Sequence, residues 1–159
     1  MLFSTRDGCW KIADFGTASK ATSKRLHTTR DSRGSNSYRA PEVLYDDGRY
    51  NNKSDIFTLG CILYEVTTGQ KLFPNDLATL QYSFNGNTSL ILWPESEPGT
   101  RLESLGKLAV AMLSIDPSMR PSAQEVKRRL DAIRMGEVLE DPQVHQVLKL
   151  NSQTGNSRI

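Results

Sequence analysis

The sequence predicts a mainly α-helical fold that begins with a short β-hairpin and continues through a long loop. Three observations support this prediction. An Asp-Gly turn separates two short apolar runs near the N-terminus, which is typical of a hairpin. Residues 17–39 are rich in Ser, Thr, Lys and Arg and have almost no large apolar side chains, which suits only a loop. Much of the later chain carries apolar residues at helical spacing.

The first elements follow from turn chemistry and loop length. The hairpin is expected to join Leu2–Ser4 to residues 10–13 through the turn at Asp7-Gly8. Loop 17–39 is longer than most loops in compact domains, so we expect it to carry function. Pro41–Leu44 are expected to form a short helix, because proline is favoured in a first helical turn.

The most apolar stretch of the chain is expected to form a buried central helix. Ser54 is its expected N-cap, residues 55–68 its body, and Gly69 its C-terminal stop. Apolar side chains point in all directions around this helix, and such a helix belongs in the middle of a domain. The apolar run over residues 56–66 is too short to span a bilayer.

Three further helices are expected toward the C-terminus. One covers residues 75–85. The next covers residues 102–113, where apolar residues recur at helical spacing ahead of an Asp-Pro pair that ends the pattern. The last is expected to start at Ser122, because Glu125 follows it in a capping-box pattern.

Composition and charge exclude several classes of function. With 159 residues, 37% hydrophobic and 24% charged, the chain has the make-up of one ordinary globular domain. A net charge of +2 is too small to indicate nucleic acid or an anionic membrane as a partner. Two cysteines without Cys-x-x-Cys spacing predict neither a metal cluster nor a disulfide framework, and they favour an intracellular location, cytoplasmic or nuclear.

Four short motifs indicate chemistry, and their order along the chain means more than any one of them. An Asp-Phe-Gly string alone often arises by chance, although a carboxylate in such a turn suits a magnesium ligand. The motifs are Asp14-Phe15-Gly16, residues 34–42 (Gly-Ser-Asn-Ser-Tyr-Arg-Ala-Pro-Glu), residues 53–61 (Lys-Ser-Asp-Ile-Phe-Thr-Leu-Gly-Cys) and residues 116–123 (Asp-Pro-Ser-Met-Arg-Pro-Ser-Ala). Together they resemble, in the same order, four segments of the eukaryotic protein kinase family, Ser/Thr type.

The resemblance implies which part of a kinase these residues represent. Residues 1–135 are expected to form part of a protein kinase domain, namely its C-terminal helical lobe with a short N-terminal β-hairpin and a long activation loop. Residues 136–159 are expected to form a tail that is partly disordered. The match places the start of the chain just after the catalytic loop of the family, as though a longer protein had been cut there.

The resemblance also implies a cofactor site at the Asp-Phe-Gly motif. Asp14 would bind the Mg²⁺ ions that bridge the phosphates of ATP. Phe15 would pack into the hydrophobic interior and report the placement of Asp14. Gly16 would supply backbone freedom for the loop to swing. Asp14, Phe15 and Gly16 are therefore the expected cofactor-binding residues, with Mg²⁺ and ATP as cofactors.

The activation loop would carry substrate-binding and regulatory residues. Ser35 stands where Ser/Thr kinases usually have a threonine beside the catalytic base, so it would help to orient the incoming hydroxyl. Thr28, Thr29 and Ser32 lie where activating phosphates often sit, and a phosphate there could pair with arginines and order the loop. The alternative is that Ser and Thr are simply common in loops.

Two structural roles carry over to the helical core. Glu42 and Arg120 match the family's buried ion pair, which ties the end of the loop to the helices. Asp55, at the start of the central helix, matches the residue that accepts backbone N–H groups of the catalytic loop. Because no such loop occurs in this sequence, Asp55 could instead cap only its own helix.

Several parts of a working kinase do not occur in these residues. The sequence has no Gly-x-Gly-x-x-Gly and no His-Arg-Asp, and the strand lysine that pairs with a helix glutamate is also missing. Without a catalytic base and a nucleotide clamp, we expect the chain alone to be inactive and to bind neither Mg²⁺ nor ATP tightly.

Three hypotheses about function remain open. The chain is part of a Ser/Thr protein kinase, whose family transfers phosphate from ATP to proteins. Alternatively, it is a kinase-derived interaction module without catalysis, which binds a protein partner through an exposed face of the central helix. The third hypothesis is a chain without stable function that is degraded after synthesis.

Overall fold

The computed structural model describes residues 2–13, 15, 27–28, 35–45, 49–86, 91 and 93–137. In chain order the elements are β1 (Leu2–Ser4), β2 (Cys9–Lys11), β3 (His27–Thr28), α1 (Pro41–Leu44), β4 (Arg49–Tyr50), α2 (Asn52–Thr68), α3 (Asp76–Asn85), α4 (Arg101–Met112), the 3-10 turn η2 (Pro117–Met119) and α5 (Ala123–Met135). The mainly helical fold is confirmed. None of these helices combines the length and the apolar character that crossing a membrane requires.

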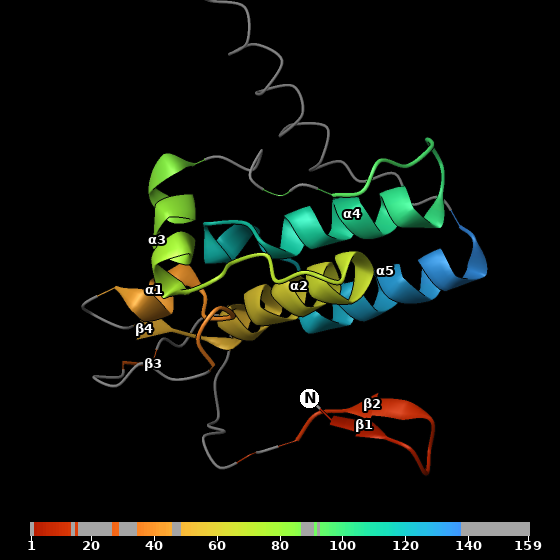
Figure 1. The fold of residues 1–159 in the computed structure, drawn as a ribbon, viewed down its shortest axis with the longest axis horizontal. Helices are drawn as coiled ribbons and strands as arrows, with labels where there is room; N and C mark the ends of the chain where they lie inside the picture. Colours follow the sequence, from red (N-terminus) through yellow and green to blue (C-terminus); the bar gives the residue numbers. More distant parts are fainter. Residues whose placement is uncertain are drawn as a thin grey trace, which may run out of the picture.

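Helix α2 lies at the centre of the helical body (Figure 1), as its all-round apolar sequence predicted. It contacts α4, and α4 in turn contacts α5. One side of α2 packs with α4 and α5 in a cluster that includes Ile56, Met112 and Val126. The other side forms an aromatic cluster in which Phe57 stacks on Phe73 at 6.0 Å between ring centroids. The central helix is thus the element that joins the two parts of the core.

The start of α2 differs from the prediction, whereas its end agrees with it. The helix begins at Asn52, and the side chain of Asn51 caps it by accepting a hydrogen bond from the Lys53 amide at 2.8 Å. The predicted cap, Ser54, is wrong because its hydroxyl lies inside the first turn and donates to Glu42 at 2.7 Å. Gly69 ends the helix in the left-handed conformation, with φ of 74°.

Of the two hydrogen bonds in the capping box predicted for the last helix, the one accepted by Ser122 is confirmed. The Ser122 hydroxyl accepts from the Glu125 amide at 3.1 Å. The Glu125 carboxylate accepts from Arg128 and Arg129 on the next turn instead of reaching back to the cap. These two side-chain hydrogen bonds lower the pKa of Glu125 to about 2. The arginines therefore take over the partner that a capping box would use.

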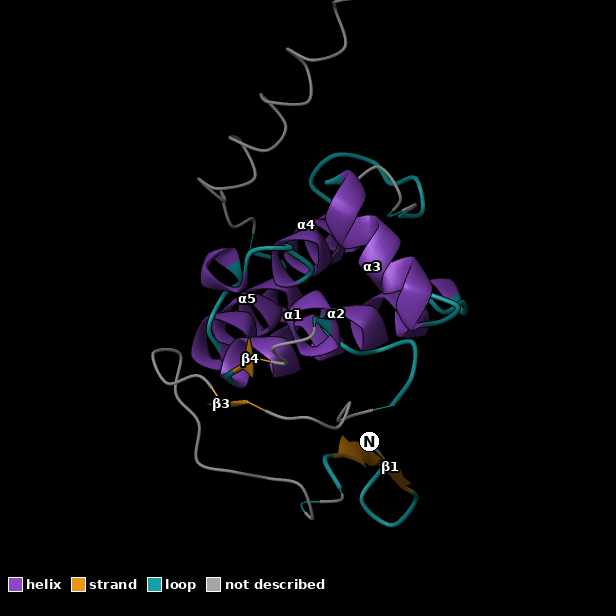
Figure 2. Ribbon diagram, turned by 90° about the vertical axis from the view of Figure 1, so that its left-hand side faces the viewer, coloured by secondary structure: helices purple, strands orange, loops and turns teal. Residues whose placement is uncertain are grey.

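The N-terminal hairpin lies apart from the helices (Figures 1 and 2). Its strands pair antiparallel, with Leu2 opposite Lys11 and Ser4 opposite Cys9, so the second strand ends two residues earlier than predicted. Phe3 is 50% exposed and Ile12 is 74% exposed. The hairpin is therefore held by its own ladder, and these two apolar side chains are not buried against the described helices.

Within loop 17–39 the structure shows a short strand that the sequence did not predict. Strand β3 pairs antiparallel with β4, and the register sets Thr28 opposite Arg49. A two-residue strand is too short to leave a pattern in the sequence. Residues 17–26 and 29–34 of this loop lie outside the described residues, as does most of the predicted tail, so the domain boundary at residue 135 stays a prediction.

Candidate functional site

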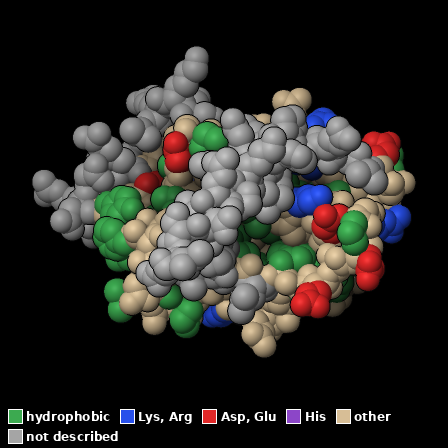
Figure 3. Space-filling view, turned by 90° about the horizontal axis from the view of Figure 1, so that it is seen from above, with side chains coloured by type: hydrophobic (Ala, Val, Ile, Leu, Met, Phe, Trp, Pro, Cys, Tyr) green, Lys and Arg blue, Asp and Glu red, His purple; other side chains and the backbone are tan. Residues whose placement is uncertain are grey.

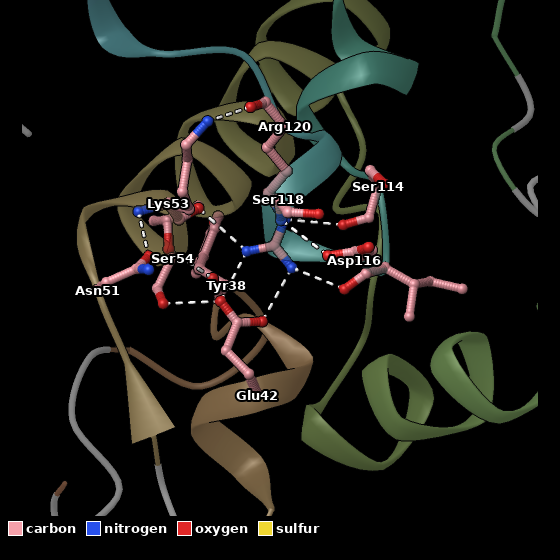
Figure 4. Close-up of polar contacts among 11 residues, drawn as sticks. Tyr38, Glu42, Asn51, Lys53, Ser54, Ser114, Asp116, Ser118 and Arg120 are labelled. Carbon is pink, nitrogen blue, oxygen red and sulfur yellow. Dashed lines mark hydrogen bonds and ion pairs between the residues drawn. The ribbon is translucent and has the colours of Figure 1, made fainter. Parts of the chain in front are cut away.

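A buried ion pair joins the end of the long loop to the helical body (Figure 4). Arg120, which follows η2, is 1% exposed, and its guanidinium makes a two-pronged contact with the Glu42 carboxylate of α1. Nη1 lies 2.6 Å from Oε1, and Nη2 lies 2.8 Å from Oε2. The residues that the sequence paired across 78 positions are therefore in direct contact.

The remaining N–H groups of Arg120 are also satisfied. An arginine side chain has five such groups. Besides the two bonds to Glu42, Nη1 donates to the Lys53 carbonyl at 3.0 Å, Nη2 to the Ile115 carbonyl at 3.1 Å and Nε to the Ser114 carbonyl at 2.7 Å. The guanidinium also lies over the Phe57 ring at 4.9 Å from its centroid. Full pairing is what allows this charge to be buried.

Lys53 closes the same cluster from the first turn of α2. Its ammonium group donates to the Arg120 carbonyl, so the two residues each donate a hydrogen bond to the other's backbone. Burial, and then the positive charge of Arg120, lower the pKa of Lys53. Ser54 on the same turn adds a hydrogen bond to Glu42. The start of α2 thus holds both partners of the ion pair.

The segment before α1 is fixed to the helices at Tyr38. The Tyr38 hydroxyl donates to the Glu65 carboxylate, and its carbonyl accepts from the Thr58 hydroxyl at 2.8 Å. The hydrogen bond to Glu65, with burial as the second cause, raises the pKa of Tyr38 to about 12. Both partners belong to α2, so the segment follows the central helix closely.

Asp76, the first residue of α3, holds the same segment at Ser37 and Arg39. Its carboxylate accepts from the Ser37 amide at 3.1 Å and forms a salt bridge with Arg39. Ser35 is exposed at the far end of this segment. The described site is therefore a strip of chain, residues 35–42, that is bonded to α2, to α3 and to Arg120, and is open to solvent at Ser35.

The predicted cofactor residues are only partly within the described residues. Asp14 and Gly16 lie outside them, so their roles as metal and nucleotide ligands stay predictions. Phe15 is described, and the expectation that it packs into the interior is wrong, because it is 70% exposed. The hairpin that precedes Phe15 lies apart from the helical core in Figure 1.

The predicted regulatory residues have a similar outcome. Thr29 and Ser32 lie outside the described residues, whereas the backbone of Thr28 lies on β3. Asp55 is on the first turn of α2 and is exposed. Burial of part of its carboxyl raises the pKa of Asp55. The Asp55 carboxylate accepts no hydrogen bond from another residue that the structure describes, so its predicted role in anchoring a loop stays a prediction.

The described residues offer no preformed metal cage. Across residues 2–13, 15, 27–28, 35–45, 49–86, 91 and 93–137, no three His, Cys, Asp or Glu side chains come together to hold a metal ion. Magnesium, however, is often held by one or two carboxylates together with nucleotide phosphates and water. Asp14 lies outside the described residues, so its role as a ligand of Mg²⁺ stays a prediction.

Sequence reasoning missed Asp76, Glu65 and Lys53 as parts of this site. Each makes a contact that spans more than 25 positions along the chain. Lys53 is the first residue of the motif over residues 53–61, so its membership in that motif could have pointed to it. Asp76 and Glu65 carried no local signal beyond being acidic residues on helices.

Comparison with known proteins gives a consistent result. A family model described as "Protein kinase domain" matches residues 1–130. Serine/threonine-protein kinase CHK1 of Saccharomyces cerevisiae is 36% identical over 132 residues, covering 77% of this chain and 24% of that protein. Serine/threonine-protein kinase Nek3 of Oryza sativa subsp. japonica is 37% identical over 126 residues, covering 79% of this chain and 20% of that protein. Dual specificity protein kinase shkE of Dictyostelium discoideum is 32% identical over 133 residues, covering 83% of this chain and 18% of that protein. The chain spans about a quarter or less of the length of these relatives.

Removing Arg120 should destabilise the chain far more than removing a surface arginine. Arg120→Ala leaves Glu42 partly buried without its partner, which we expect to cost about 3–5 kcal/mol of unfolding free energy and to abolish a cooperative melt. Arg128→Ala is the matched control, because its pair with Glu125 is on the surface and is expected to contribute little to stability. Urea unfolding followed by circular dichroism measures both. An Arg120→Ala protein whose urea-unfolding curve matches that of wild type would contradict the role given to this ion pair.

Alkaline pH should weaken the attachment of Tyr38. A folded-state pKa of about 12, above the ordinary tyrosine value of 10.0, means that the folded chain holds this proton more tightly than the unfolded chain. The resulting stability is fully present below pH 10 and is lost as pH rises toward 12. In urea unfolding at a series of pH values, the advantage of wild type over Tyr38→Phe should shrink across this window. A constant difference between the two proteins would show that this hydroxyl does not titrate as expected.

Proposed function

The chain belongs to the protein kinase family, and from this premise we propose that it supplies the substrate-binding part of a Ser/Thr protein kinase domain. One observation carries the proposal. Residues 35–42, the segment that the family places under the protein substrate, are tied to the helical body by the Glu42–Arg120 ion pair and by Tyr38. A strip fixed in this way can bind an extended peptide without first having to order itself.

Three residues of the strip and Asp14 have distinct tasks in this proposal. Ser35, exposed at its open end, helps to orient the hydroxyl that receives the phosphoryl group. Tyr38 and Glu42 fix the strip behind Ser35, so that the position of the hydroxyl is set by helices rather than by the loop alone. Asp14 would hold Mg²⁺, which neutralises charge on the phosphates of ATP when both are bound.

The preference for Ser and Thr as acceptors is also a proposal. It is supported by the sequence of residues 34–42, which resembles the Ser/Thr type, and by the names of two of the relatives. Another relative is named as a dual specificity kinase. The location proposed for the chain is intracellular, cytoplasmic or nuclear, which fits two free cysteines, one of them exposed.

We propose further that these 159 residues, taken by themselves, do not transfer phosphate. Phosphoryl transfer needs a group that accepts the proton of the substrate hydroxyl and groups that clamp the nucleotide. The sequence contains neither a His-Arg-Asp motif nor a Gly-rich loop. Each missing component lowers the rate by orders of magnitude, so the single carboxylate of Asp14 is not sufficient.

A second candidate function is a binding module without catalysis, and the exposed apolar side chains favour it. Val66, on the central helix, is 69% exposed, and Leu77 and Phe84 on α3 are 62% and 76% exposed. Figure 3 shows hydrophobic side chains gathered at the end of the molecule where α3 lies in Figure 1. Such surfaces often bind another protein. A chain that binds a protein through these side chains but does not bind substrate-like peptides would favour this candidate.

Incubation with Mg-ATP and a generic Ser/Thr protein substrate should give no phosphate incorporation above background. The matched control is Asp14→Ala, which removes the proposed metal ligand, and both proteins should give the same signal. Radiolabelled phosphate transfer measures the difference directly. Turnover by wild type that exceeds the Asp14→Ala signal would show that the proposed inactivity of these residues is wrong.

Binding of peptides tests the substrate-binding role without requiring catalysis. A mixture of synthetic peptides with a central Ser between randomised residues should shift the backbone NMR signals of residues 35–38 in the isotopically labelled chain. Signals around Lys127 on the exposed face of α5 serve as the internal control and should not move. If the peptides shift both regions equally, or shift neither, the substrate-binding role is contradicted.

A further inference from the structure

Ser37 stands in an unfavourable backbone conformation within a tight turn. Its φ is 77°, and no other non-glycine residue in the described part of the chain has a positive φ. The Tyr38 amide donates to the Ser35 carbonyl at 3.2 Å, so residues 35–38 form a β-turn with Ser37 in the third position. A positive φ at this position favours Gly or Asn, because a larger side chain crowds the backbone. Contacts outside the turn are needed to hold Ser37 in place.

Asp76 and the residues just before it provide those contacts. Oδ1 of Asp76 accepts from the Ser37 amide at 3.1 Å, and Oδ2 accepts from Nη1 of Arg39. The Asp76 amide in turn donates to the Asn36 side chain at 3.1 Å. The Ser37 hydroxyl donates to the Pro74 carbonyl at 2.9 Å. Asn36, Ser37 and Arg39 are thus all bonded to one short stretch at the start of α3.

The position of Asp76 makes it a rigid anchor for the turn. It is the first residue of α3, and the helix is capped by the neighbouring Asn75, whose side chain accepts from the Ala78 amide at 3.0 Å. The Asp76 carboxylate is therefore free to bond the loop. The Asp76 and Arg39 side chains are 24% and 19% exposed, so their salt bridge is partly shielded from water. Ser37 itself is 4% exposed.

The anchored turn faces solvent on one side only. Ser35 and Asn36 are exposed, whereas Ser37 is buried beneath them. We propose that Asp76 is a positioning residue for the protein substrate: by holding Ser37 in the left-handed conformation, it fixes the angle at which Ser35 and Asn36 meet a Ser/Thr-containing peptide. This inference rests on the proposed substrate-binding function and adds a residue from α3, outside residues 35–42, to that site.

The test compares four forms of the full 159-residue chain. Asp76→Ala removes both acceptors. Asp76→Ala with Ser37→Gly removes them, together with the bond from the Ser37 hydroxyl to the Pro74 carbonyl, but supplies a residue that adopts positive φ readily. Asp131→Ala is the matched control, because Asp131 forms a salt bridge with Lys127 on α5, away from the loop. Amide hydrogen exchange at Ser37 and Tyr38 measures the turn, and the central-Ser peptide mixture measures binding by NMR titration.

We expect Asp76→Ala to speed exchange at both amides and to weaken peptide binding by about tenfold. Adding Ser37→Gly should return both values toward those of wild type, which a general loss of stability would not do. Asp131→Ala should change neither. If Asp76→Ala fails to fold, Asp76→Asn replaces it, since the amide keeps one acceptor for Ser37 but offers Arg39 an N–H₂ group.

The failure of this inference and the failure of the proposed function give different results. If wild type binds the peptides and Asp76→Ala binds them equally well, the inference is overturned while the substrate-binding role stands. If wild type binds no peptide, the proposed function fails. The exchange data then decide whether Asp76 holds the turn, and unchanged exchange at Ser37 and Tyr38 overturns that claim as well.

Discussion

The buried charge of Arg120 is the constraint on which the rest of the helical body depends. A guanidinium that is 1% exposed is tolerated only when its N–H groups are all paired. Its acceptors come from α1, from the first turn of α2 and from the chain between α4 and η2. These segments are far apart in sequence, so they must be in place together. The ion pair therefore makes the end of the long loop part of the core.

This constraint explains why the start of α2 is crowded with polar groups although the helix lies at the centre of the helical body. Asn51 caps the helix, Ser54 bonds Glu42, and the Lys53 carbonyl receives Arg120. Further along, the same helix turns to apolar packing, with Phe57 against Phe73 and Ile56 in the cluster shared with α4 and α5. One helix thus fixes the loop at its polar end and organises the core along its apolar length.

Much of the fold could be predicted from local signals. The end of α2 at Gly69 and the start of α5 at Ser122 follow from backbone and capping chemistry that acts over a few residues. The start of α2 was misjudged because Asn51 and Ser54 are both good caps, and only the tertiary bond from Ser54 to Glu42 decides between them. The exposure of Phe15 could not be predicted either, because it depends on where the hairpin lies and not on its own residues.

The site shows the same division between local and distant information. Glu42 and Arg120 were paired in advance because both belong to recognisable motifs, whereas Asp76 belongs to none and meets Ser37 across 39 positions. A contact of that kind becomes visible only when the helices are assembled.

The contacts that the structure describes belong mainly to the substrate half of the expected reaction. The substrate side, from Ser37 to Glu42, is bonded to α2, α3 and the chain around η2. The nucleotide side is represented among the described residues by Phe15, which is exposed beside a hairpin that lies apart from the helices. Binding a peptide requires only the first half, whereas transferring phosphate requires both halves in a fixed relation. The contacts among the described residues belong to peptide recognition, which is why the proposal treats recognition separately from phosphate transfer.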